Sequence, residues 1–167
     1  MPTTEHHALD EIDLRILAEL QKDGRIRNNE LAERVGLSEP PCRRRVRSLR
    51  ERGYVSAIRA TLDEKLLGYE VISYVLIQLQ SQAQATLQAF EKSIAAMPLV
   101  QQSWRISGDA DYLLKCVARN VEGTHQQLLQ FSAMPEVRHI RTFPVLGVAK
   151  DAPLPLPRAP SASGPAQ

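Results

Sequence analysis

Residues 38–52, Ser-Glu-Pro-Pro-Cys-Arg-Arg-Arg-Val-Arg-Ser-Leu-Arg-Glu-Arg, decide how the first third of this 167-residue chain is expected to fold. At about 100° per residue, Cys42, Val46 and Leu49 fall on one apolar stripe of a helix. The other side is basic, because the stretch carries six arginines against two glutamates. Ser38 stands where an N-cap is typical, and a first helical turn tolerates the two prolines that follow. The pattern predicts an amphipathic helix that buries one side and can lay the other against a nucleic-acid backbone.

Two shorter helical patterns precede this stretch. The first is expected to begin at Asp10, a candidate N-cap, and the second to run from about Asn28 to Gly36. Only a two-residue glycine turn separates the second helix from Ser38. Two helices joined by so short a turn must cross steeply, which is the helix-turn-helix arrangement. Residues 54–61 are expected to follow as an extended, wing-like segment.

The second half of the chain alternates between strand and helix patterns. The order strand-helix-strand-strand-helix-strand predicts a ferredoxin-like fold, so the chain as a whole is expected to be α+β. The expected strands cover residues 71–79, 100–106, 112–118 and 137–148, and the expected helices lie near residues 87–97 and 121–132.

The first of these strands, residues 71–79, is apolar on both faces although helices can cover only one. The uncovered face is therefore expected to meet a second copy of the chain and form a dimer. Trp104 is expected in the core or at this interface. On the last helix, the residues expected to face inward are Val121, His125, Leu128, Leu129 and Ser132.

Composition limits the class of protein. With 43% hydrophobic and 24% charged residues, the chain fits a globular protein with room for two small domains. Its net charge is only +2, and most of the positive excess lies in residues 43–52. No apolar run approaches the roughly 18 residues that span a bilayer, and the N-terminus lacks a signal-peptide core. A cytoplasmic protein without a membrane partner is expected. Cys42 and Cys116 have no metal-ligand spacing and are expected to be buried free thiols.

These patterns divide the chain into successive segments. The proline-rich end has no hydrophobic periodicity and is expected to be disordered. The expected organisation is a disordered N-terminus over residues 1–8, a helix-turn-helix domain over 9–62, a linker over 63–70, a ferredoxin-like domain over 71–150, and a disordered tail over 151–167.

Several of these motifs together resemble one known family. Residues 9–17, 23–26, 30–32, 35–38 and 45–53 resemble the helix-turn-helix of the Lrp/AsnC (leucine-responsive, feast/famine) transcriptional regulators. Residues 107–114, Ser-Gly-Asp-Ala-Asp-Tyr-Leu-Leu, resemble the glycine-to-aspartate turn of that family's regulatory domain. Two departures stand out. This chain has Ala57-Ile58 where the family usually has Gly-Tyr, and Pro144 interrupts the expected last strand, which an edge strand tolerates.

The resemblance implies a DNA-binding transcription regulator with a winged helix-turn-helix and an effector-binding ferredoxin-like domain. It implies double-stranded DNA as one partner and an amino acid or related small molecule as the other. It also implies homodimers that assemble into tetramers or octamers. By themselves, Gly108–Asp111 read as a polar hairpin turn. In the family this turn and the last strand line an amino-acid pocket at a subunit interface. The resemblance therefore suggests as effector-binding residues Gly108, Asp109, Asp111 and Tyr112, with Thr142, Phe143 and Val145 opposite.

Arg44 and Arg47 are the leading candidates for contacts to base edges or phosphates, because a guanidinium forks two donors toward guanine edges and phosphate oxygens alike. A merely solvated charged face is the alternative. Arg45 lies beside the apolar stripe, where either a structural role or a phosphate contact fits. The remaining candidates near the two helix starts are Ser38, Glu39, Pro40, Arg43, Arg25 and Asn28.

Two other classes of function are alternatives to a transcription regulator. An enzyme would need a nucleophile-base pair, a metal cluster or a phosphate loop, and the sequence shows none of these, so neither catalysis nor a cofactor or metal is expected. An architectural DNA-binding protein without an effector is the alternative that the sequence separates poorly from a regulator. Calorimetry against the twenty amino acids would distinguish the two.

Overall fold

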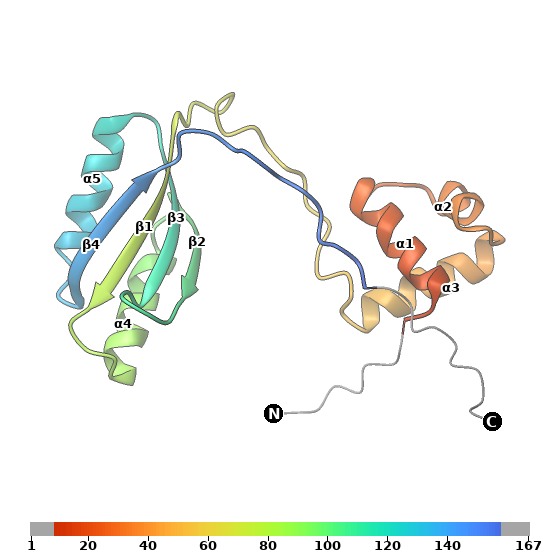
Figure 1. Ribbon diagram of the computed structural model, residues 1–167, viewed down its shortest axis with the longest axis horizontal. Helices are drawn as coiled ribbons and strands as arrows, with labels where there is room; N and C mark the ends of the chain where they lie inside the picture. The colour runs from red at the N-terminus through yellow and green to blue at the C-terminus, as the bar shows by residue number, and fades with distance from the viewer. Residues whose placement is uncertain (1–8, 158–167) are drawn as a thin grey trace. The chain divides into compact units, whose positions relative to one another are not determined.

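The computed structural model describes residues 9–157, which form two compact units (Figure 1). We call residues 9–61 with 151–157 the helical unit, and residues 62–150 the sheet unit. The helical unit contains α1 (Glu11–Lys22), α2 (Asn28–Val35) and α3 (Glu39–Glu51). The sheet unit contains β1 (Val71–Leu79), α4 (Gln84–Ala95), β2 (Val100–Arg105), β3 (Tyr112–Ala118), α5 (Val121–Ser132) and β4 (Val137–Pro144).

The three helices of the helical unit pack around one apolar cluster. Ile16 of α1, Leu31 of α2, and Cys42 and Leu49 of α3 are buried in it with at most 1% of their surface exposed. These residues repeat at helical spacing, so each helix presents one apolar side to the other two. The predicted apolar stripe of α3 is confirmed, and the stripe fixes which side of α3 faces outward.

The turn between α2 and α3 is built on a glycine with left-handed backbone. Gly36 has φ +74° and ψ +35°, a conformation that L side chains rarely adopt. The Leu37 N–H then donates to the Ala32 carbonyl at 2.8 Å, which closes a Schellman-type helix end. Because α3 begins only three residues after Gly36, this turn sets the steep crossing predicted for a helix-turn-helix.

One detail of this unit differs from expectation, because Ser38 is the N-cap residue of α3 but its side chain makes no capping hydrogen bond. Residues 54–61, the predicted wing-like segment, contain neither a helix nor a strand. Ile58 in this segment lies against the end of α1, where a Cβ added to Gly24 would be only 2.8 Å from the Ile58 Cγ2.

The sheet unit has the predicted βαββαβ order. Its four antiparallel strands are arranged β2-β3-β1-β4, with α4 and α5 packed against them (Figure 1). Ile77, Phe90, Leu114 and Phe131 are fully buried between the sheet and the two helices. The last strand ends at Pro144, four residues before the predicted end. The missing N–H of Pro144 costs no pairing with β1, because β4 is an edge strand and the next N–H, that of Val145, still donates to the Ile72 carbonyl at 2.8 Å.

Of the five residues predicted to face inward on α5, Leu128 packs partly buried against the core, and the prediction is wrong for the other four. Val121 and Leu129 are 77% and 50% exposed, and His125 and Ser132 are exposed as well, whereas Gln127 and Phe131 are buried. The buried amide of Gln127 has a hydrogen-bond partner, because its Nε2 donates to the Val117 carbonyl at 3.3 Å. A polar side chain thus occupies a position that a hydrophobic pattern assigns to the outside.

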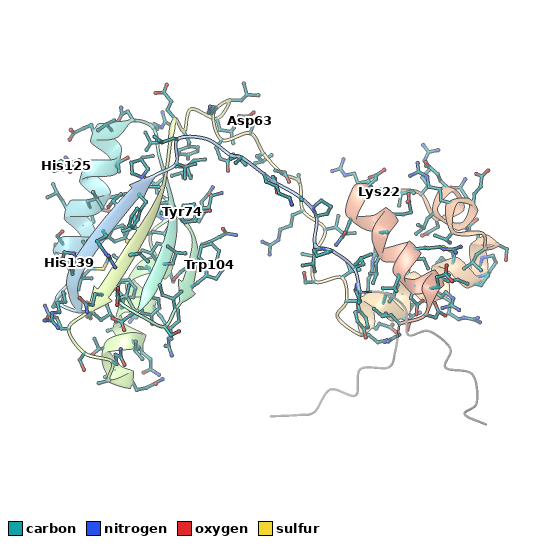
Figure 2. The ribbon with its side chains drawn as sticks, in the orientation of Figure 1. Lys22, Asp63, Tyr74, Trp104, His125 and His139 are labelled. Atoms are coloured by element: carbon teal, nitrogen blue, oxygen red, sulfur yellow. The ribbon has the colours of Figure 1, made fainter. Side chains whose placement is uncertain are left out.

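The sheet face away from α4 and α5 carries exposed aromatic side chains. Tyr74, Trp104 and Phe143 are 36%, 41% and 50% exposed. Figure 2 shows Tyr74 and Trp104 on the side of the sheet opposite His125 of α5, as the strand register also requires. We call these three residues with Leu76 and Leu113 the open sheet face. The prediction that residues 71–79, now β1, are apolar on both faces of the sheet is confirmed.

The segments expected to be a linker and a disordered tail both make contacts. Residues 63–69 form a compact turn held by helix-like backbone hydrogen bonds, and the Glu64 carboxylate pairs with Lys115 of β3 at 3.4 Å. At the other end, Leu156 packs against the apolar cluster of the helical unit, which differs from the expected tail. The expected disorder of residues 1–8 and 158–167 lies outside the described residues.

Candidate DNA-binding surface and ligand pocket

The outer side of α3 is a basic surface. Arg43, Arg44, Arg47 and Arg50 are all exposed on it, opposite the buried Cys42, Val46 and Leu49. Neither Arg43 nor Arg44 is held by an ion pair among the described residues. The surface can therefore offer unneutralised guanidinium groups to phosphates or base edges.

Arg47 pairs with Glu51 one turn further along the same helix. Its Nε lies 2.7 Å from the Glu51 Oε1, with the two side chains 80% and 61% exposed. The hydrogen bond that Arg47 donates to the Glu51 carboxylate raises the pKa of Arg47, so this side chain stays charged. Because a pair so open to water and salt is weak, phosphate can displace Glu51 at little cost.

Arg45 has a different position from its neighbours. Its Nη1 donates to the Asp13 Oδ1 at 2.8 Å and to the Asp10 Oδ2 at 2.6 Å. These contacts tie α3 to the first turn of α1, where Asp10 is also the N-cap and accepts from the Asp13 N–H at 2.8 Å. Burial opposes ionisation of Asp10, but the hydrogen bonds from the Asp13 N–H and Arg45 lower its pKa. Arg45 was expected to have either a structural role or a phosphate contact, and these ion pairs show the structural role.

The other predicted DNA-contacting residues lie at the starts of α2 and α3. Ser38, Glu39 and Pro40 are exposed where α3 begins, and Asn28 is the exposed first residue of α2. Arg25 is exposed in the preceding turn, where its backbone N–H donates to the Asp23 carboxylate at 2.8 Å. The helical unit therefore presents all of the predicted candidates at its surface except Arg45, which is half-buried.

In the sheet unit, the predicted glycine-to-aspartate turn borders a polar cavity of about 210 Å³. Gly108 has φ +121°, which an L side chain rarely adopts. The cavity is lined by residues that include Gly108, Asp109, Asp111, Arg138 and three glutamines, Gln78, Gln80 and Gln82. Sequence reasoning missed Arg138 and the glutamines. The strand register would have found them, because the end of β1 pairs with the start of β4.

A second cavity of about 310 Å³ lies along the same turn. It shares Gln82, Gly108 and Asp111 with the first cavity and adds the apolar side chains of Leu87 and Ile106. The turn is thus bordered by a polar cavity with charges of both signs and by a partly apolar one. This combination suits a small molecule with charged and apolar ends.

Two of the predicted effector residues are already engaged within the chain. The Asp111 Oδ2 accepts the Leu79 N–H at 2.7 Å, and its Oδ1 accepts the Gln82 Nε2 at 3.0 Å. Tyr112 is 1% exposed, and its hydroxyl donates to the Glu91 Oε1 at 2.7 Å. Burial and the contact with Glu91 raise the pKa of Tyr112. Asp111 shapes the turn, and Tyr112 belongs to the core.

The predicted residues on the last strand do not join the turn within one chain. Thr142 pairs with Val75 of β1, and β1 lies between β4 and β3. The turn before Tyr112 lies level with Ile140 and residues before it, so Thr142, Phe143 and Val145 are further along β4. Of the predicted effector residues, the structure groups only Gly108, Asp109 and Asp111 around the polar cavity.

Two other features, a metal-ion site and a membrane-spanning helix, are not found among residues 9–157. No three His, Cys, Asp or Glu side chains among residues 9–157 are grouped so that they could hold a metal ion. Over the same residues, no helix is both long and apolar enough to cross a membrane.

Comparison with known proteins agrees with this two-part architecture. Residues 9–56 match a winged helix-turn-helix DNA-binding family, and residues 72–155 match the Lrp/AsnC ligand binding domain. The leucine-responsive regulatory protein of Rhizobium meliloti (strain 1021) is 45% identical over 86% of this chain and 93% of that protein. The leucine-responsive regulatory protein of Escherichia coli (strain K12) is 37% identical over 86% of this chain and 88% of that protein.

Two solved structures have the same fold. A transcriptional regulator of Neisseria meningitidis, solved as a complex with L-Met, has a TM-score of 0.83 at 29% identity and covers 88% of this chain and 96% of its own. An AsnC family regulator from Agrobacterium tumefaciens has a TM-score of 0.81 at 30% identity and covers 88% and 97%.

A helix-turn-helix with an outward basic helix, followed by a ligand-binding α+β domain, defines a DNA-binding transcription regulator. Since a relative 45% identical matches over most of both chains, this chain belongs to the Lrp/AsnC family. The family consists of transcriptional regulators, which agrees with the expectation that the chain is not an enzyme.

Proposed function

We propose that this regulator binds specific DNA sequences through the basic surface of α3, acts as an oligomer of at least two copies, and changes its DNA binding when an amino acid occupies the cavity beside Gly108–Asp111. The L-Met complex of the related Neisseria regulator supports an amino acid as the class of effector. The same mode of action requires double-stranded DNA as the partner of the helical unit.

The observation that carries the effector proposal is that side chains of opposite charge line the polar cavity. Asp109 and Arg138 both line it, and these two side chains make no ion pair with each other. An amino acid is a zwitterion, so its carboxylate matches a guanidinium and its ammonium matches a carboxylate. Backbone N–H groups near Gly108 add donors for the carboxylate. Asp109 and Arg138 are therefore the proposed charge partners of the effector.

The open sheet face supports the proposed dimer. Tyr74, Trp104 and Phe143 form an exposed aromatic surface on strands whose other side is the core. Aromatic residues on an uncovered sheet are typical of an interface with a second copy. The proposal includes assembly of such dimers into tetramers or octamers, as the family resemblance implies.

The DNA-binding proposal is tested with the intact protein and the DNA upstream of its own gene, over a series of salt concentrations. Loss of Arg44 and Arg47 together, R44A/R47A, removes two guanidinium groups from the proposed contact surface. We expect at least a tenfold loss of affinity and a shallower dependence on salt. Lys92→Ala together with Arg119→Ala is the matched control, because both are exposed cations of the sheet unit and the pair also removes two positive charges. Equal losses in both variants would show that charge alone, and not α3, controls binding.

The effector proposal is tested by calorimetry with each of the twenty amino acids. We expect heat from a subset of them, and D109N/R138Q should abolish this heat while leaving DNA affinity without amino acid unchanged. A wholly silent panel would favour an architectural DNA-binding protein without an effector. Binding that survives in D109N/R138Q would place the amino acid elsewhere.

A further inference from the structure

The chain returns to the helical unit after it completes the sheet. Beyond β4, the Val145 N–H still donates to the Ile72 carbonyl at 2.8 Å, which is the last backbone anchor to the sheet. Residues 151–157 then belong to the helical unit, not to the sheet unit that precedes them in the sequence. The chain therefore passes between the two units twice, once at residues 61–62 and again at residues 150–151.

The returning segment is held by a hydrogen bond and by an apolar side chain. The Gln21 Nε2 of α1 donates to the Leu154 carbonyl at 3.2 Å. Two residues later, half-buried Leu156 packs against the cluster that includes Ile16, Leu17 and Leu49. The neighbouring Leu154 side chain is 74% exposed, so only one of the two leucines faces the cluster.

The composition of this segment favours docking in an extended form. Residues 153–157 read Pro-Leu-Pro-Leu-Pro, and each proline fixes its own φ near −65°. A segment that is already stiff loses less conformational entropy when it docks. It lies beside a groove of about 700 Å³ that is lined by Leu17 and Leu20 of α1 and by Tyr54, Val55 and Ile58 after α3. A proline-rich composition is thus compatible with a docked segment as well as with a disordered tail.

We propose that residues 151–157 are a strap that closes the helical unit and restrains its motion on the connection at residues 61–62. Only nine residue steps separate the sheet anchor at Val145 from the docked Leu154, and they reach at most about 32 Å when fully extended. A unit held by two connections samples fewer orientations than a unit on one flexible linker. The strap therefore limits how the basic surface of α3 can be presented.

The docking step is tested by amide hydrogen exchange on the intact protein. In Leu156→Ser, we expect exchange in residues 17–22 and 54–58 to accelerate about tenfold, because the strap no longer covers them. Leu154→Ser changes a neighbouring leucine whose side chain is exposed, and exchange there should match the wild type. Unchanged exchange in Leu156→Ser would overturn the proposal, and so would equal acceleration in both variants.

The restraint is tested by truncation and fluorescence anisotropy decay. A dye is attached through Glu33→Cys, an exposed site on α2, while the native cysteines are buried. A chain ending at Asp151 should show a fast decay component that a chain ending at Pro157 lacks. Identical decays for the two truncated chains would overturn the restraint. Neither measurement uses DNA or an amino acid, so both are independent of the proposed regulatory function.

Discussion

The arginines of α3 differ in role because their side chains meet different partners. Arg43 and Arg44 face outward, whereas the Arg45 guanidinium lies 2.6 Å and 2.8 Å from the carboxylates of Asp10 and Asp13. In the sequence, Arg45 lies beside the apolar stripe, where both a structural role and a phosphate contact fit. The decisive partners lie 32 and 35 positions earlier in the chain, so only tertiary packing brings them within reach.

Replacing Arg45 with methionine should destabilise the helical unit by about 1–2 kcal/mol at pH 7, because the carboxylates of Asp10 and Asp13 both lose their charged donor. The pH dependence has a definite sign. Asp10 has a lowered pKa in the fold, so its stabilisation is complete above its ordinary value near 4 and is lost as the pH falls below that. Urea unfolding at pH 7 and at pH 3 should show the wild type and R45M converging in acid. A gap of equal size at both pH values would contradict this account.

The two cysteines should resist thiol reagents in the folded protein. Burial raises the pKa of Cys116 to about 11, and burial together with Glu39 raises the pKa of Cys42. At pH 8 only about 0.1% of the Cys116 thiol is ionised, and the thiolate is the reactive form. A chromogenic disulfide reagent should therefore titrate no thiol in native protein and two in urea. Rapid reaction of either cysteine in native protein would show that its site opens readily.

At the scale of elements, the α2–α3 turn depends on one backbone conformation. Gly36 at φ +74° has open space around its Cβ position, so only the strain of the left-handed region opposes a side chain there. Gly36→Ala should cost about 1 kcal/mol of unfolding free energy, and Gly36→Asn less, because asparagine tolerates this region better. Chemical denaturation of both variants measures the difference. Equal stabilities of the two variants would argue against backbone strain as the cause.

Most elements could be predicted from sequence because their signals are local. Asp10 caps α1, Gly36 ends α2, and strands and helices follow one another in the predicted order through the sheet unit. The face of α5 could not be predicted in this way. Gln127 is buried only because the Val117 carbonyl of β3 accepts its amide, and no periodicity within the helix reveals that partner.

At the scale of the whole molecule, the open sheet face predicts self-association. Trp104→Glu places a charge among the exposed aromatic residues, so we expect the proposed dimer to dissociate to monomers at micromolar concentration. Size-exclusion chromatography with light scattering gives the mass directly. Gln130→Glu is the control. It adds the same charge at an exposed position of α5, on the other side of the sheet, and should leave the mass unchanged. A wild-type monomer, or a dimer in both variants, would refute the role of this face.

The candidate sites could be predicted only in part, because some of their residues depend on contacts between distant segments. The exposed arginines of α3 follow from the helical period alone. Arg138 lines the polar cavity because β4 pairs with β1, whereas Asp111 already accepts hydrogen bonds from the Leu79 N–H and Gln82. Leu156 was missed for the same kind of reason, since its neighbours lie more than 100 positions away in the sequence.

The two crossings of the chain between its units have a practical consequence for protein engineering. Leu9 and Leu156 pack against the same apolar cluster, so the sheet unit is inserted into the sequence of the helical unit and does not simply follow it. A chimaera that gives this DNA-binding module a different sensor therefore needs two seams, near residues 61–62 and 150–151. Grafting at the first seam alone would discard the piece that finishes the module.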